Sequence, residues 1–293
     1  MQLLDGKACA LAYKAQIAES VQSHVSVGVR KPHLAAILVG NDGASETYIA
    51  SKVKTCAELG FDSTLLRFDS DVDENQLLDA VKAFNSNPSI DGILVQLPLP
   101  AHINASKITL AIDPTKDVDG FHPENLGRML LGLPSFIPAT PKGIMMLLEH
   151  NSISTTGLHA VVLGRSHIVG SPLSVLLARN TEPGNCTVTL CHSKSRNLES
   201  ILQQADLLVA ALGRPEFVKA GMVKQGAIVI DVGITRVIDA ANPKGYVLKG
   251  DVAFDEVCQK TSWITPVPGG VGAMTIAALM QNTFEAWKRN TEI

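Results

Sequence analysis

Aromatic residues are scarce in this chain of 293 residues: phenylalanine, tryptophan and tyrosine together make up 4%. Charged residues account for 18%, hydrophobic residues for 46%, and there are 23 glycines. An aliphatic, glycine-rich and aromatic-poor composition favours a layered α/β architecture over an all-β sandwich. The length suits two domains of ordinary size, each able to bury its own core.

Long basic runs and long apolar runs are also absent. The formal net charge is −3 at pH 7, and the lysines and arginines are scattered along the chain. A nucleic acid partner is therefore not expected, because neutralising phosphates needs clustered positive charge. The apolar runs are broken by glycine or charge before they reach membrane-spanning length, so a membrane partner is not expected either.

Cysteine pairs of the CxxC type are missing as well. The 5 cysteines are odd in number and widely spaced, which argues against a disulfide framework and against structural zinc. An acidic cluster at 69–74 lacks the glycine and closing glutamate of a calcium loop, so we interpret it as a loop with a helix start. The first residues, which include Asp5 and Lys7, show no signal-peptide pattern. These features predict a cytoplasmic protein without a metal site.

One stretch with chemical potential follows the apolar run at 34–39, which we interpret as a buried strand. A Gly/Asn/Asp turn leads into a helical pattern over 46–59, with Ser45 as the expected helix start. Tyr48 and Lys52 lie four residues apart on one face of this helix, beside its apolar stripe. Burial there would lower the pKa of the lysine and permit proton exchange near neutral pH. A lysine at this spacing can equally extend its amine to solvent.

The first hundred residues alternate between strand and helix. Apolar, β-favouring segments at 34–39, 63–68 and 90–100 are separated by helical patterns, and prolines end the last segment. Such alternation predicts a parallel sheet covered by helices. Ligands of open α/β sheets bind beyond the carboxyl ends of the strands, and Gln96 lies at such an end. Lys52, on the helix after an earlier strand, is expected at the same edge.

A turn-rich segment over 113–123 comes next. Asp117 and Asp119 within it can cap a helix or receive a set of hydrogen-bond donors. An irregular stretch at 129–138 marks the expected end of the first domain. The connecting helix then opens at 140–144, with a proline near its start.

The second half opens with a strand, a glycine turn and a helix over 158–172. Gly164 and Gly170 are separated by five residues, which departs from the GxGxxG spacing. Backbone amides at such a helix start can receive phosphate oxygens. Further strands at 207–211 and 227–232, each ending near a glycine, match a nucleotide-binding doubly wound domain.

The strand exit near residue 192 indicates which dinucleotide would bind. NAD sites usually present an acidic residue to the ribose hydroxyls, whereas NADP sites present hydroxyl and basic groups to the 2′-phosphate. Here Ser193, Lys194, Ser195 and Arg196 leave the strand, with no acidic residue until Glu199. This chemistry favours NADP.

A glycine- and proline-rich segment over 266–272 precedes the C-terminal helix, which we expect at 276–288. Its composition fits either a rigid hinge or a backbone cradle for a ligand. The C-terminal helix is expected to return to the first domain. The expected domains are therefore residues 1–139 with 276–293, and residues 140–275.

Six segments together resemble one family, the bifunctional methylenetetrahydrofolate dehydrogenase/methenyltetrahydrofolate cyclohydrolases. They run in the family's order over essentially the whole chain: Tyr48–Lys52, Gly92–Pro100, Lys116–Gly120, Gly164–Ser166, Cys191–Ser193 and Pro266–Gly272. Each segment alone is weakly or moderately specific, whereas the combination is highly specific. The resemblance implies two three-layer α/β domains, a folate-binding catalytic domain with a parallel sheet and a Rossmann-type NADP domain, with the active-site cleft between them.

The resemblance also implies an activity within one-carbon metabolism and purine biosynthesis. NADP would oxidise 5,10-methylenetetrahydrofolate to the 5,10-methenyl form, which is then hydrolysed to 10-formyltetrahydrofolate. Hydride transfer needs no acid or base from the protein, because the substrate's own nitrogen stabilises the iminium product. Water attack on the methenyl carbon does need proton handling. A homodimer formed through the nucleotide domain is implied as well.

The matching motifs carry the family's site residues onto this chain. Lys52 is implied as the acid/base group of the hydrolysis, Gln96 as its hydrogen-bond partner and Tyr48 as a ring that stacks on the folate. Asp119 would bind the amide-and-amino edge of the pterin, since a carboxylate accepts two parallel hydrogen bonds. The other implied folate contacts are Val95, Leu97, Pro268, Gly269, Gly270, Val271 and Gly272. The implied NADP contacts are Gly164, Arg165, Ser166, Gly170, Ser193 and Ile234.

Within the NADP set, Arg165 and Ser193 are the implied partners of the 2′-phosphate, and Ile234 is the implied nicotinamide-side contact. The chain departs from the family pattern in two places. Ala273 stands where the family usually has proline, which loosens the φ restraint of the glycine-rich loop. Residues 181–184 resemble an insertion in a surface loop.

Alternative functions were weighed against this one. Short-chain dehydrogenases also use Tyr-x-x-x-Lys with NADP, but their pair follows the glycine loop, whereas here it precedes Gly164 by more than a hundred residues. A dehydrogenase with weak or no cyclohydrolase activity stays open. So does a non-enzymatic folate- or nucleotide-binding protein, although such a protein could lose Lys52, Gln96 or Asp119, and all three are present.

Overall fold

The computed structural model describes residues 1–243 and 245–292. The chain forms two compact units, residues 11–139 with 276–293 and residues 1–10 with 140–275. We call them the three-stranded unit and the six-stranded unit after their parallel sheets. No helix in the described part of the chain is long and apolar enough to cross a membrane.

The three-stranded unit has a parallel sheet of order β3-β2-β4, with β2 in the centre. Its strands are β2 (His33–Val39), β3 (Asp62–Phe68) and β4 (Gly92–Val95). Its helices are α2 (Gly43–Glu58), α3 (Glu74–Ser86), α4 (Ala105–Ala111) and α5 (Pro123–Leu130), together with most of α1 (Gly6–Ser26) and α10 (Val271–Thr291).

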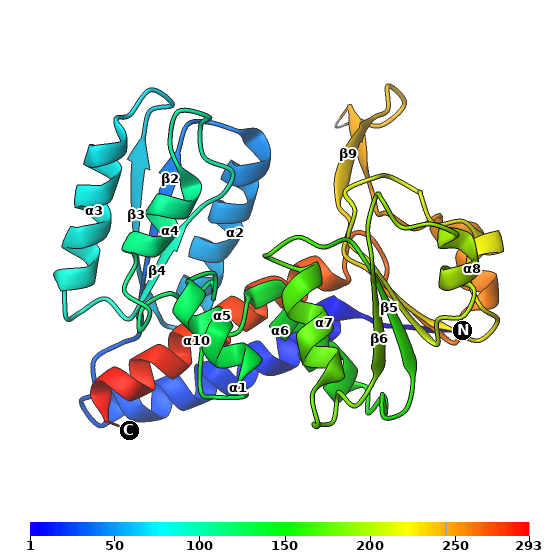
Figure 1. Cartoon of the computed structure of the whole chain (residues 1–293). Helices are drawn as coiled ribbons and strands as arrows, with labels where there is room; N and C mark the ends of the chain where they lie inside the picture. The colour runs from blue at the N-terminus through cyan, green and yellow to red at the C-terminus, as the bar shows by residue number, and fades with distance from the viewer. Residues whose placement is uncertain (244, 293) are drawn as a thin grey trace. The chain divides into compact units, whose positions relative to one another are not determined.

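Helices cover both faces of this sheet, with α2 on one face and α3 and α4 on the other (Figure 1). The core on the α3 and α4 side is aliphatic: it contains Ala35, Ile37, Val39, Val72, Leu77, Val81, Ile90, Ile93, Val95, Ile103, Ile108 and Ile112. Alternate residues of β2 and β4 thus enter one core, as expected for strands buried on both faces of a parallel sheet. The sequence-based prediction of a helix-covered parallel sheet is confirmed.

Helix α2 begins earlier than the sequence pattern predicts. The expected start was Ser45, but the N-cap is Asp42, whose carboxylate accepts the backbone N–H of Ser45 at 2.8 Å. Aspartate is a strong N-cap because its side chain satisfies an amide that has no partner within the helix. Gly40, with φ of 78°, forms the turn between β2 and this cap. The turn and the cap together set the direction in which α2 leaves the strand.

Helix α10 also begins earlier than expected, at Val271 in place of Ile276. The buried side chains of Val271, Met274, Ala277 and Ala278 continue the helical spacing through the glycine-rich segment. Later in α10, Trp287 packs edge-on against His24 of α1, with ring centroids 5.7 Å apart, and its indole N–H donates to the Arg30 carbonyl at 2.9 Å. These contacts join both terminal helices to the three-stranded unit.

The six-stranded unit has a parallel sheet of order β1-β11-β8-β7-β5-β6. Its strands are β1 (Gln2–Leu3), β5 (His159–Leu163), β6 (Thr187–Cys191), β7 (Leu207–Ala210), β8 (Ile228–Asp231) and β11 (Trp263–Ile264). Its helical segments are α6 (Ala139–His150), α7 (Gly170–Ala178), α8 (Leu198–Leu202), η1 (Ala220–Met222), α9 (Phe254–Val257) and η2 (Cys258–Lys260).

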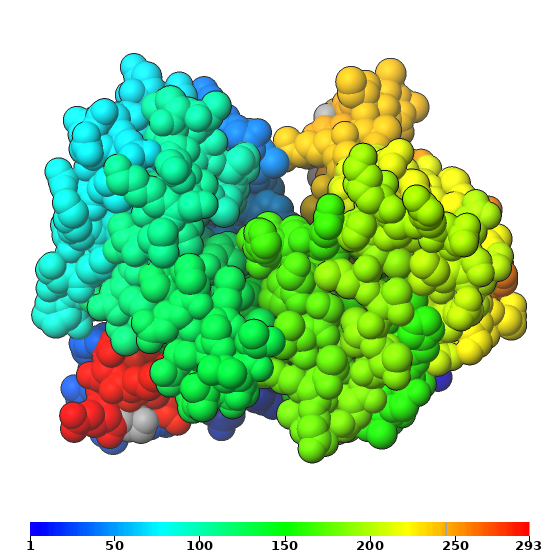
Figure 2. Space-filling view, in the orientation of Figure 1, coloured from blue at the N-terminus to red at the C-terminus, as the bar shows by residue number. Residues whose placement is uncertain are grey.

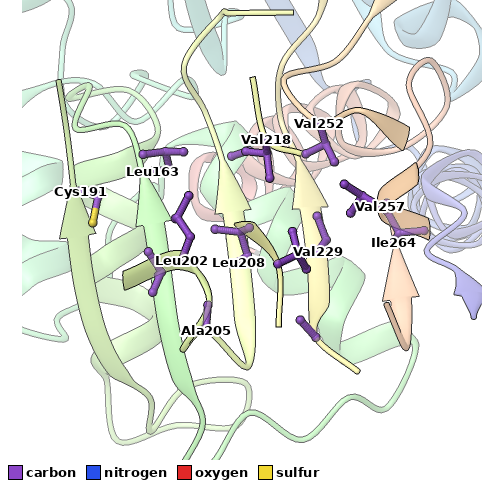
Figure 3. Close-up of a cluster of buried hydrophobic side chains, with 14 of the residues drawn as sticks. Leu163, Cys191, Leu202, Ala205, Leu208, Val218, Val229, Val252, Val257 and Ile264 are labelled. Carbon is purple, nitrogen blue, oxygen red and sulfur yellow. The ribbon is translucent and has the colours of Figure 1, made fainter. Parts of the chain in front are cut away.

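The core on one face of this sheet is drawn in Figure 3. Side chains of five strands meet there with residues of α8, α9 and the segments that connect them (Figure 3). Val218 and Val252 lie near the carboxyl ends of β7 and β8 in this view. They form an isolated parallel bridge, so the core extends to the edge of the sheet where a doubly wound fold binds its ligand.

A two-stranded hairpin, β9 (Thr235–Ile238) and β10 (Tyr246–Lys249), is a feature that the sequence reading did not predict. Its strands are antiparallel, and Figure 2 shows the hairpin standing out from the surface of its unit. Ile238 is 90% exposed. The hairpin begins four residues after β8 ends, directly after Ile234.

The first ten residues correct the expected domain division. They were expected in the first domain, but β1 pairs in parallel with β11, which places residues 1–10 in the six-stranded unit. The physical reason is the pairing of Gln2 and Leu3 with Trp263 and Ile264, which extends the larger sheet at its edge. A two-residue strand has too little pattern to be recognised from sequence.

Candidate functional site

Lys52 is a buried lysine. It lies on the inward face of α2 with Ile49 and Cys56, and it is only 6% exposed. The alternative that its amine extends to solvent is therefore wrong. Tyr48 lies one turn earlier on the same helix and is half-buried. Helix α2 thus carries an ammonium group and a phenol side by side, as the spacing predicts.

Gln96 holds the amine of Lys52. The Lys52 Nζ donates to the Gln96 Oε1 at 3.0 Å, and the Gln96 Nε2 donates to the Leu97 carbonyl at 2.6 Å. The backbone N–H of Gln96 donates to the Ile37 carbonyl of β2 at 2.9 Å, so both the backbone and the side chain of this residue are held. Val95, the last residue of β4, is buried, and Leu97 is half-buried beside it. The predicted hydrogen bond between Lys52 and Gln96 is present.

Asp119 lies in a turn that is shaped by a second, buried aspartate. The Asp117 carboxylate accepts the backbone N–H groups of Phe121 at 3.3 Å and His122 at 2.8 Å. It also accepts the side-chain amide of Asn125 at 2.9 Å. The sequence reading left open whether Asp117 caps a helix or receives donors; it receives donors at the start of α5 and so closes the turn that carries Asp119.

The charges of Lys52 and Asp119 oppose the effect of their burial. Burial lowers the pKa of Lys52, and the negative charge of Asp119 counteracts this shift. Burial raises the pKa of Asp119, and the positive charge of Lys52 counteracts that shift. Burial likewise raises the pKa of Tyr48, which keeps its phenol protonated. Burial raises the pKa of Asp117 to about 6 despite its three hydrogen-bond donors.

This arrangement can exchange a proton below the pH at which an ordinary lysine does, because burial lowers the pKa of Lys52. A lysine whose pKa is lowered by burial has a neutral form that can accept a proton, and an amide that accepts from its Nζ fixes where that proton goes. Asp119 offers a carboxylate for two parallel hydrogen bonds to a planar group. In the described ranges 1–243 and 245–292, no three His, Cys, Asp or Glu side chains are placed to hold a metal ion.

The second group of predicted residues lies at the carboxyl edge of the six-stranded sheet. Leu163 of β5 is in register with Cys191 of β6, so Gly164 and Ser193 follow neighbouring strands. Gly164 has φ of 121°, and a Cβ there would lie 2.1 Å from the Ala211 carbonyl oxygen. A Cβ at Gly170 would lie 1.8 Å from the Gly164 carbonyl oxygen. Both glycines are required for the tight turn into α7.

The side chains around this glycine turn suit a phosphate group. Arg165, Ser166 and Ser193 are exposed, and Ser166 accepts the Val169 N–H with its Oγ at 3.2 Å, which shapes the turn. The strand exits therefore present a guanidinium and hydroxyl groups to solvent, and these are groups that donate hydrogen bonds to phosphate oxygens. The glycine cradle and these donors fit a bound dinucleotide phosphate.

Ile234 and the 268–272 segment also belong to the six-stranded unit. Ile234 is 44% exposed, three residues beyond the end of β8. Gly269 has φ of 114°, and its carbonyl accepts the backbone N–H of Lys7 at 3.0 Å. A Cβ at Gly270 would lie 2.7 Å from the Pro266 carbonyl oxygen, so the chain approaches itself too closely for a side chain. Val271 and Gly272 form the first turn of α10.

The structure therefore brings the predicted residues together in two groups. Tyr48, Lys52, Gln96 and Asp119 gather in the three-stranded unit with Val95 and Leu97. The predicted NADP contacts and the 268–272 segment lie in the six-stranded unit.

Two further groups were missed by the sequence reading. Lys7 lies along Gly269, and Asp231 and Asp251 are buried carboxylates near the ends of β8 and β10. An aspartate at the end of an apolar run and two residues before a glycine, as in Asp231-Val232-Gly233, is the signal that could have drawn attention to the first of these carboxylates.

Comparisons with known proteins agree with this two-part geometry. Residues 4–119 match the model of the tetrahydrofolate dehydrogenase/cyclohydrolase catalytic domain, and residues 138–291 match that of the tetrahydrofolate dehydrogenase/cyclohydrolase NAD(P)-binding domain. The bifunctional protein FolD of Flavobacterium johnsoniae is 59% identical over 288 residues, which cover 98% of each chain.

Solved structures are similar over nearly the whole chain as well. The bifunctional enzyme FolD of Campylobacter jejuni superimposes with a TM-score of 0.92 at 44% identity, covering 99% of both chains. FolD of Trypanosoma brucei, solved with NADP cofactor and an inhibitor, has a TM-score of 0.92 at 36% identity, covering 99% of this chain and 98% of that one. The chain belongs to the tetrahydrofolate dehydrogenase/cyclohydrolase family.

Proposed function

We propose that the chain is a bifunctional enzyme that oxidises 5,10-methylenetetrahydrofolate with NADP and hydrolyses the 5,10-methenyl product to 10-formyltetrahydrofolate. The observation that carries this proposal is the buried amine of Lys52, held at 3.0 Å by Gln96 in a chain of this family. Burying an ammonium costs stability, so a buried lysine in that setting supports a role in which its proton is used.

Lys52 is the acid/base group of the hydrolysis step. Attack of water on the methenyl carbon forms a C–O bond, breaks the C=N double bond and releases a proton, which the neutral amine can receive directly or through one water molecule. The bond from this carbon to N5 then breaks, N5 takes up a proton, and the formyl group stays on N10. The lowered pKa provides the neutral form, and the charge of Asp119 stabilises the ammonium that results. Gln96 acts as a positioning residue, because its own amide is fixed by Leu97 and β2.

The three-stranded unit offers three kinds of contact for the folate. Tyr48 offers a half-buried ring for stacking, Asp119 a carboxylate for the amide-and-amino edge of the pterin, and Val95 and Leu97 an apolar strand end. The backbone of Pro268–Gly272 supplies the remaining contact. Gly269 has no side chain to cover its half-buried backbone, whereas Gly270 is buried against Pro266.

The six-stranded unit is the NADP-binding part. NADP, when bound, supplies the hydride acceptor, and the residues of this chain only orient and hold it. The turn from Gly164 to Gly170 receives the phosphates, and Ile234 bounds the nicotinamide side. Arg165 and Ser193 bind the 2′-phosphate, for which Arg165 offers a planar set of donors. Methylene carbon and nicotinamide must then be aligned, which is a task of positioning and needs no proton transfer.

The assembly is a homodimer formed through the six-stranded unit. In support, the β9–β10 hairpin projects from that unit with Ile238 90% exposed, and an exposed two-stranded ribbon is a common pairing surface (Figure 2).

A cytoplasmic location is proposed as well. All five cysteines are free and buried, which suits the reducing environment of the cytoplasm.

A coupled assay tests the proposal. The protein is incubated with 5,10-methylenetetrahydrofolate and either NADP or NAD, and the reduced cofactor, the methenyl form and 10-formyltetrahydrofolate are followed separately. We expect reduction of NADP in clear preference to NAD, followed by formation of 10-formyltetrahydrofolate faster than in buffer. Accumulation of the methenyl form alone would indicate a dehydrogenase without cyclohydrolase activity, and no turnover with either cofactor would leave only a binding protein.

A further inference from the structure

Two buried carboxylates meet at the carboxyl edge of the six-stranded sheet. Asp231 is the last residue of β8 and is 3% exposed; Asp251 follows β10 and is 0% exposed. Neither has a role in the two reactions as described above. Burial of two aspartates in contact is costly, so their placement calls for a physical reason.

Asp231 ties the two ends of the hairpin segment together. Its Oδ1 accepts the N–H of Gly233 at 3.0 Å and that of Asp251 at 2.9 Å, and its Oδ2 accepts the N–H of Val252 at 2.9 Å. Gly233 precedes Ile234 and the hairpin, whereas Asp251 and Val252 follow it. One carboxylate therefore closes a loop of about twenty residues at its base.

Asp251 continues the same chain of contacts to the neighbouring strand. Its Oδ2 accepts the N–H groups of Leu212 and Gly213, and its Oδ1 accepts that of Arg214 at 2.6 Å. These three residues follow β7, and Ala211 just before them contacts Gly164 at the glycine turn. The exits of β5, β7 and β8 are thus linked by packing and by two carboxylates.

The two glycines that line the carboxylates leave no room for side chains. A Cβ at Gly250 would lie 1.9 Å from the Asp231 Oδ2, and one at Gly233 would lie 2.4 Å from the Asp251 Cγ. The backbone therefore approaches both carboxylates as closely as it can. Six backbone N–H groups satisfy four carboxylate oxygens, an arrangement that fixes backbone geometry.

We propose that Asp231 and Asp251 are positioning residues of the NADP site, which hold the exits of β7 and β8, and with them Ile234, in the shape that binds the cofactor. This inference rests on the proposed function, because it assumes that NADP binds along this edge. The carboxylates act through backbone groups and need no contact with the cofactor. Their effect is expected on cofactor binding and on alignment of the nicotinamide.

The charge state of Asp231 gives this role a dependence on pH. Burial, and secondarily the charge of Asp251, raise the pKa of Asp231 to about 7, although backbone N–H groups oppose the shift. Other charged groups near it are Glu216, Lys249 and Asp255, which line the same cavity of about 240 Å³; Lys249 and Glu216 pair at 2.8 Å. Protonation of Asp231 removes acceptor strength at the base of the hairpin segment. Cofactor affinity is therefore expected to fall as the pH falls through about 7.

The same shift shows that the ionised form does not serve stability. A carboxyl group whose pKa is raised in the folded state destabilises the fold as the pH rises from its ordinary range through the raised value. Ionised Asp231 is therefore expected to lower the stability of the fold above pH about 7. A residue that lowers stability at working pH, next to a site that needs defined backbone geometry, is more simply explained by function.

The decisive variant is Asp231→Asn, with Asp206→Asn as the matched control. Asp206 is also a carboxylate that accepts a backbone N–H in this unit, that of His159 at 2.9 Å, but it lies at the amino edge of the sheet and pairs with Lys224. In Asp231→Asn one amide group faces N–H donors in place of an acceptor. We expect the KM for NADP to rise about tenfold, with hydrolysis of added 5,10-methenyltetrahydrofolate within twofold of wild type.

The pH dependence of NADP binding supplies the second measurement, and it does not depend on any variant folding. Direct titration of wild type between pH 6 and 8.5 should show the dissociation constant rising below pH about 7. The 2′-phosphate also titrates near pH 6, so the Asp206→Asn profile serves as reference. It should match wild type, while Asp231→Asn should lose the inflection near 7.

The outcomes separate this inference from the proposed function. Wild type that fails to bind or reduce NADP overturns the function itself. Wild type that binds NADP with no inflection near pH 7, or an Asp231→Asn protein whose KM for NADP equals that of Asp206→Asn, overturns the positioning role alone. Equal loss of dehydrogenase and hydrolysis in Asp231→Asn would show a general structural role in place of the one proposed.

Discussion

The two units of this protein hold their aspartates near the carboxyl edges of the sheets in different ways. In the three-stranded unit the charge of Asp119 acts on the buried amine of Lys52, whose hydrogen bond is made by a side chain, Gln96. In the six-stranded unit the carboxylates of Asp231 and Asp251 accept hydrogen bonds from backbone N–H groups. Among the described residues these are their hydrogen-bond donors. One edge is built from side chains that carry opposite charges, the other from carboxylates and backbone.

With the function proposed above, the difference corresponds to the needs of the two reactions. Hydrolysis moves a proton, and a buried ammonium with a carboxylate nearby can change its charge at moderate cost. Hydride transfer needs alignment, and a carboxylate held by several backbone amides fixes the path of the chain. Each edge can therefore be broken separately, and variants of one should spare the other.

Removing the amine of Lys52 is the strongest test of this separation. We expect Lys52→Met to lower the rate of methenyltetrahydrofolate hydrolysis at least a hundredfold, because a positioned acid/base group contributes about 10²–10⁴ in rate. NADP affinity should stay within twofold of wild type. Both are measured on the same protein, by the decay of added methenyl-folate and by direct titration with NADP.

Lys54→Met is the matched control for this variant. Lys54 lies two residues further along α2, and its side chain is 78% exposed. Its replacement should leave hydrolysis unchanged. In wild type, hydrolysis should increase with pH as Lys52 loses its proton, and the inflection should lie below the ordinary lysine pKa because burial lowers the pKa of Lys52. Undiminished hydrolysis in Lys52→Met would refute the acid/base assignment.

The three-stranded unit is the part that could be predicted best from the sequence. The strand at His33–Val39, the helix that carries Lys52 and the strand end before Gln96 follow from hydrophobic runs and turn residues, which are local signals. Because carboxyl ends of parallel strands share one edge, strand order predicts that Lys52 and Gln96 lie at the same edge, whereas their hydrogen bond is implied only by the family resemblance. The start of α2 was misplaced by a few residues because Asp42 and Ser45 are both good N-caps.

The six-stranded unit was predicted less completely because its missed features depend on contacts between distant segments. The pairing of β1 with β11 joins residues separated by most of the chain, and neither two-residue strand has a pattern of its own. The contact of Asp231 with Asp251 spans the hairpin, which was itself not predicted. Backbone N–H groups that converge on a carboxylate carry no residue type that a sequence could display.

Arg165→Ala tests whether the exposed guanidinium beside the glycine turn of the six-stranded unit binds the 2′-phosphate of NADP. We expect the KM for NADP to rise about tenfold, since a charge-assisted hydrogen bond to a phosphate is lost, and the KM for NAD to change less than twofold. The KM for the folate substrate should stay unchanged. Steady-state rates with both cofactors provide the measurement.

Lys224→Ala serves as the control for Arg165→Ala. Lys224 is a basic residue of the same unit that pairs with Asp206 at the amino edge of the sheet. Its loss should leave both cofactor KM values unchanged. If Arg165→Ala raised the KM values for NADP, NAD and folate by the same factor, the residue would shape the turn and would not read the 2′-phosphate.

The smallest effect is expected at Ala273, where the backbone of the six-stranded unit enters α10. Ala273 is the third residue of this helix, and its N–H donates to the Gly270 carbonyl at 3.3 Å, a long hydrogen bond. Proline is tolerated in the first turn of a helix, and it stabilises by restricting the unfolded chain. Ala273→Pro should therefore raise the free energy of unfolding by at most about 1 kcal/mol, measured by thermal or denaturant unfolding.

The effect of Ala273→Pro on activity then bears on the comparison between the two edges. If the glycine-rich segment acts through its backbone, a stiffer entry into α10 should lower the KM for the folate substrate slightly and leave the KM for NADP unchanged. A destabilised protein would mean that the bond to Gly270 outweighs the gain in the unfolded state. A raised folate KM with unchanged stability would mean that the glycine-rich segment must move to admit the substrate. This segment would then depend on backbone flexibility, whereas the exits of β7 and β8 are held in place by carboxylates.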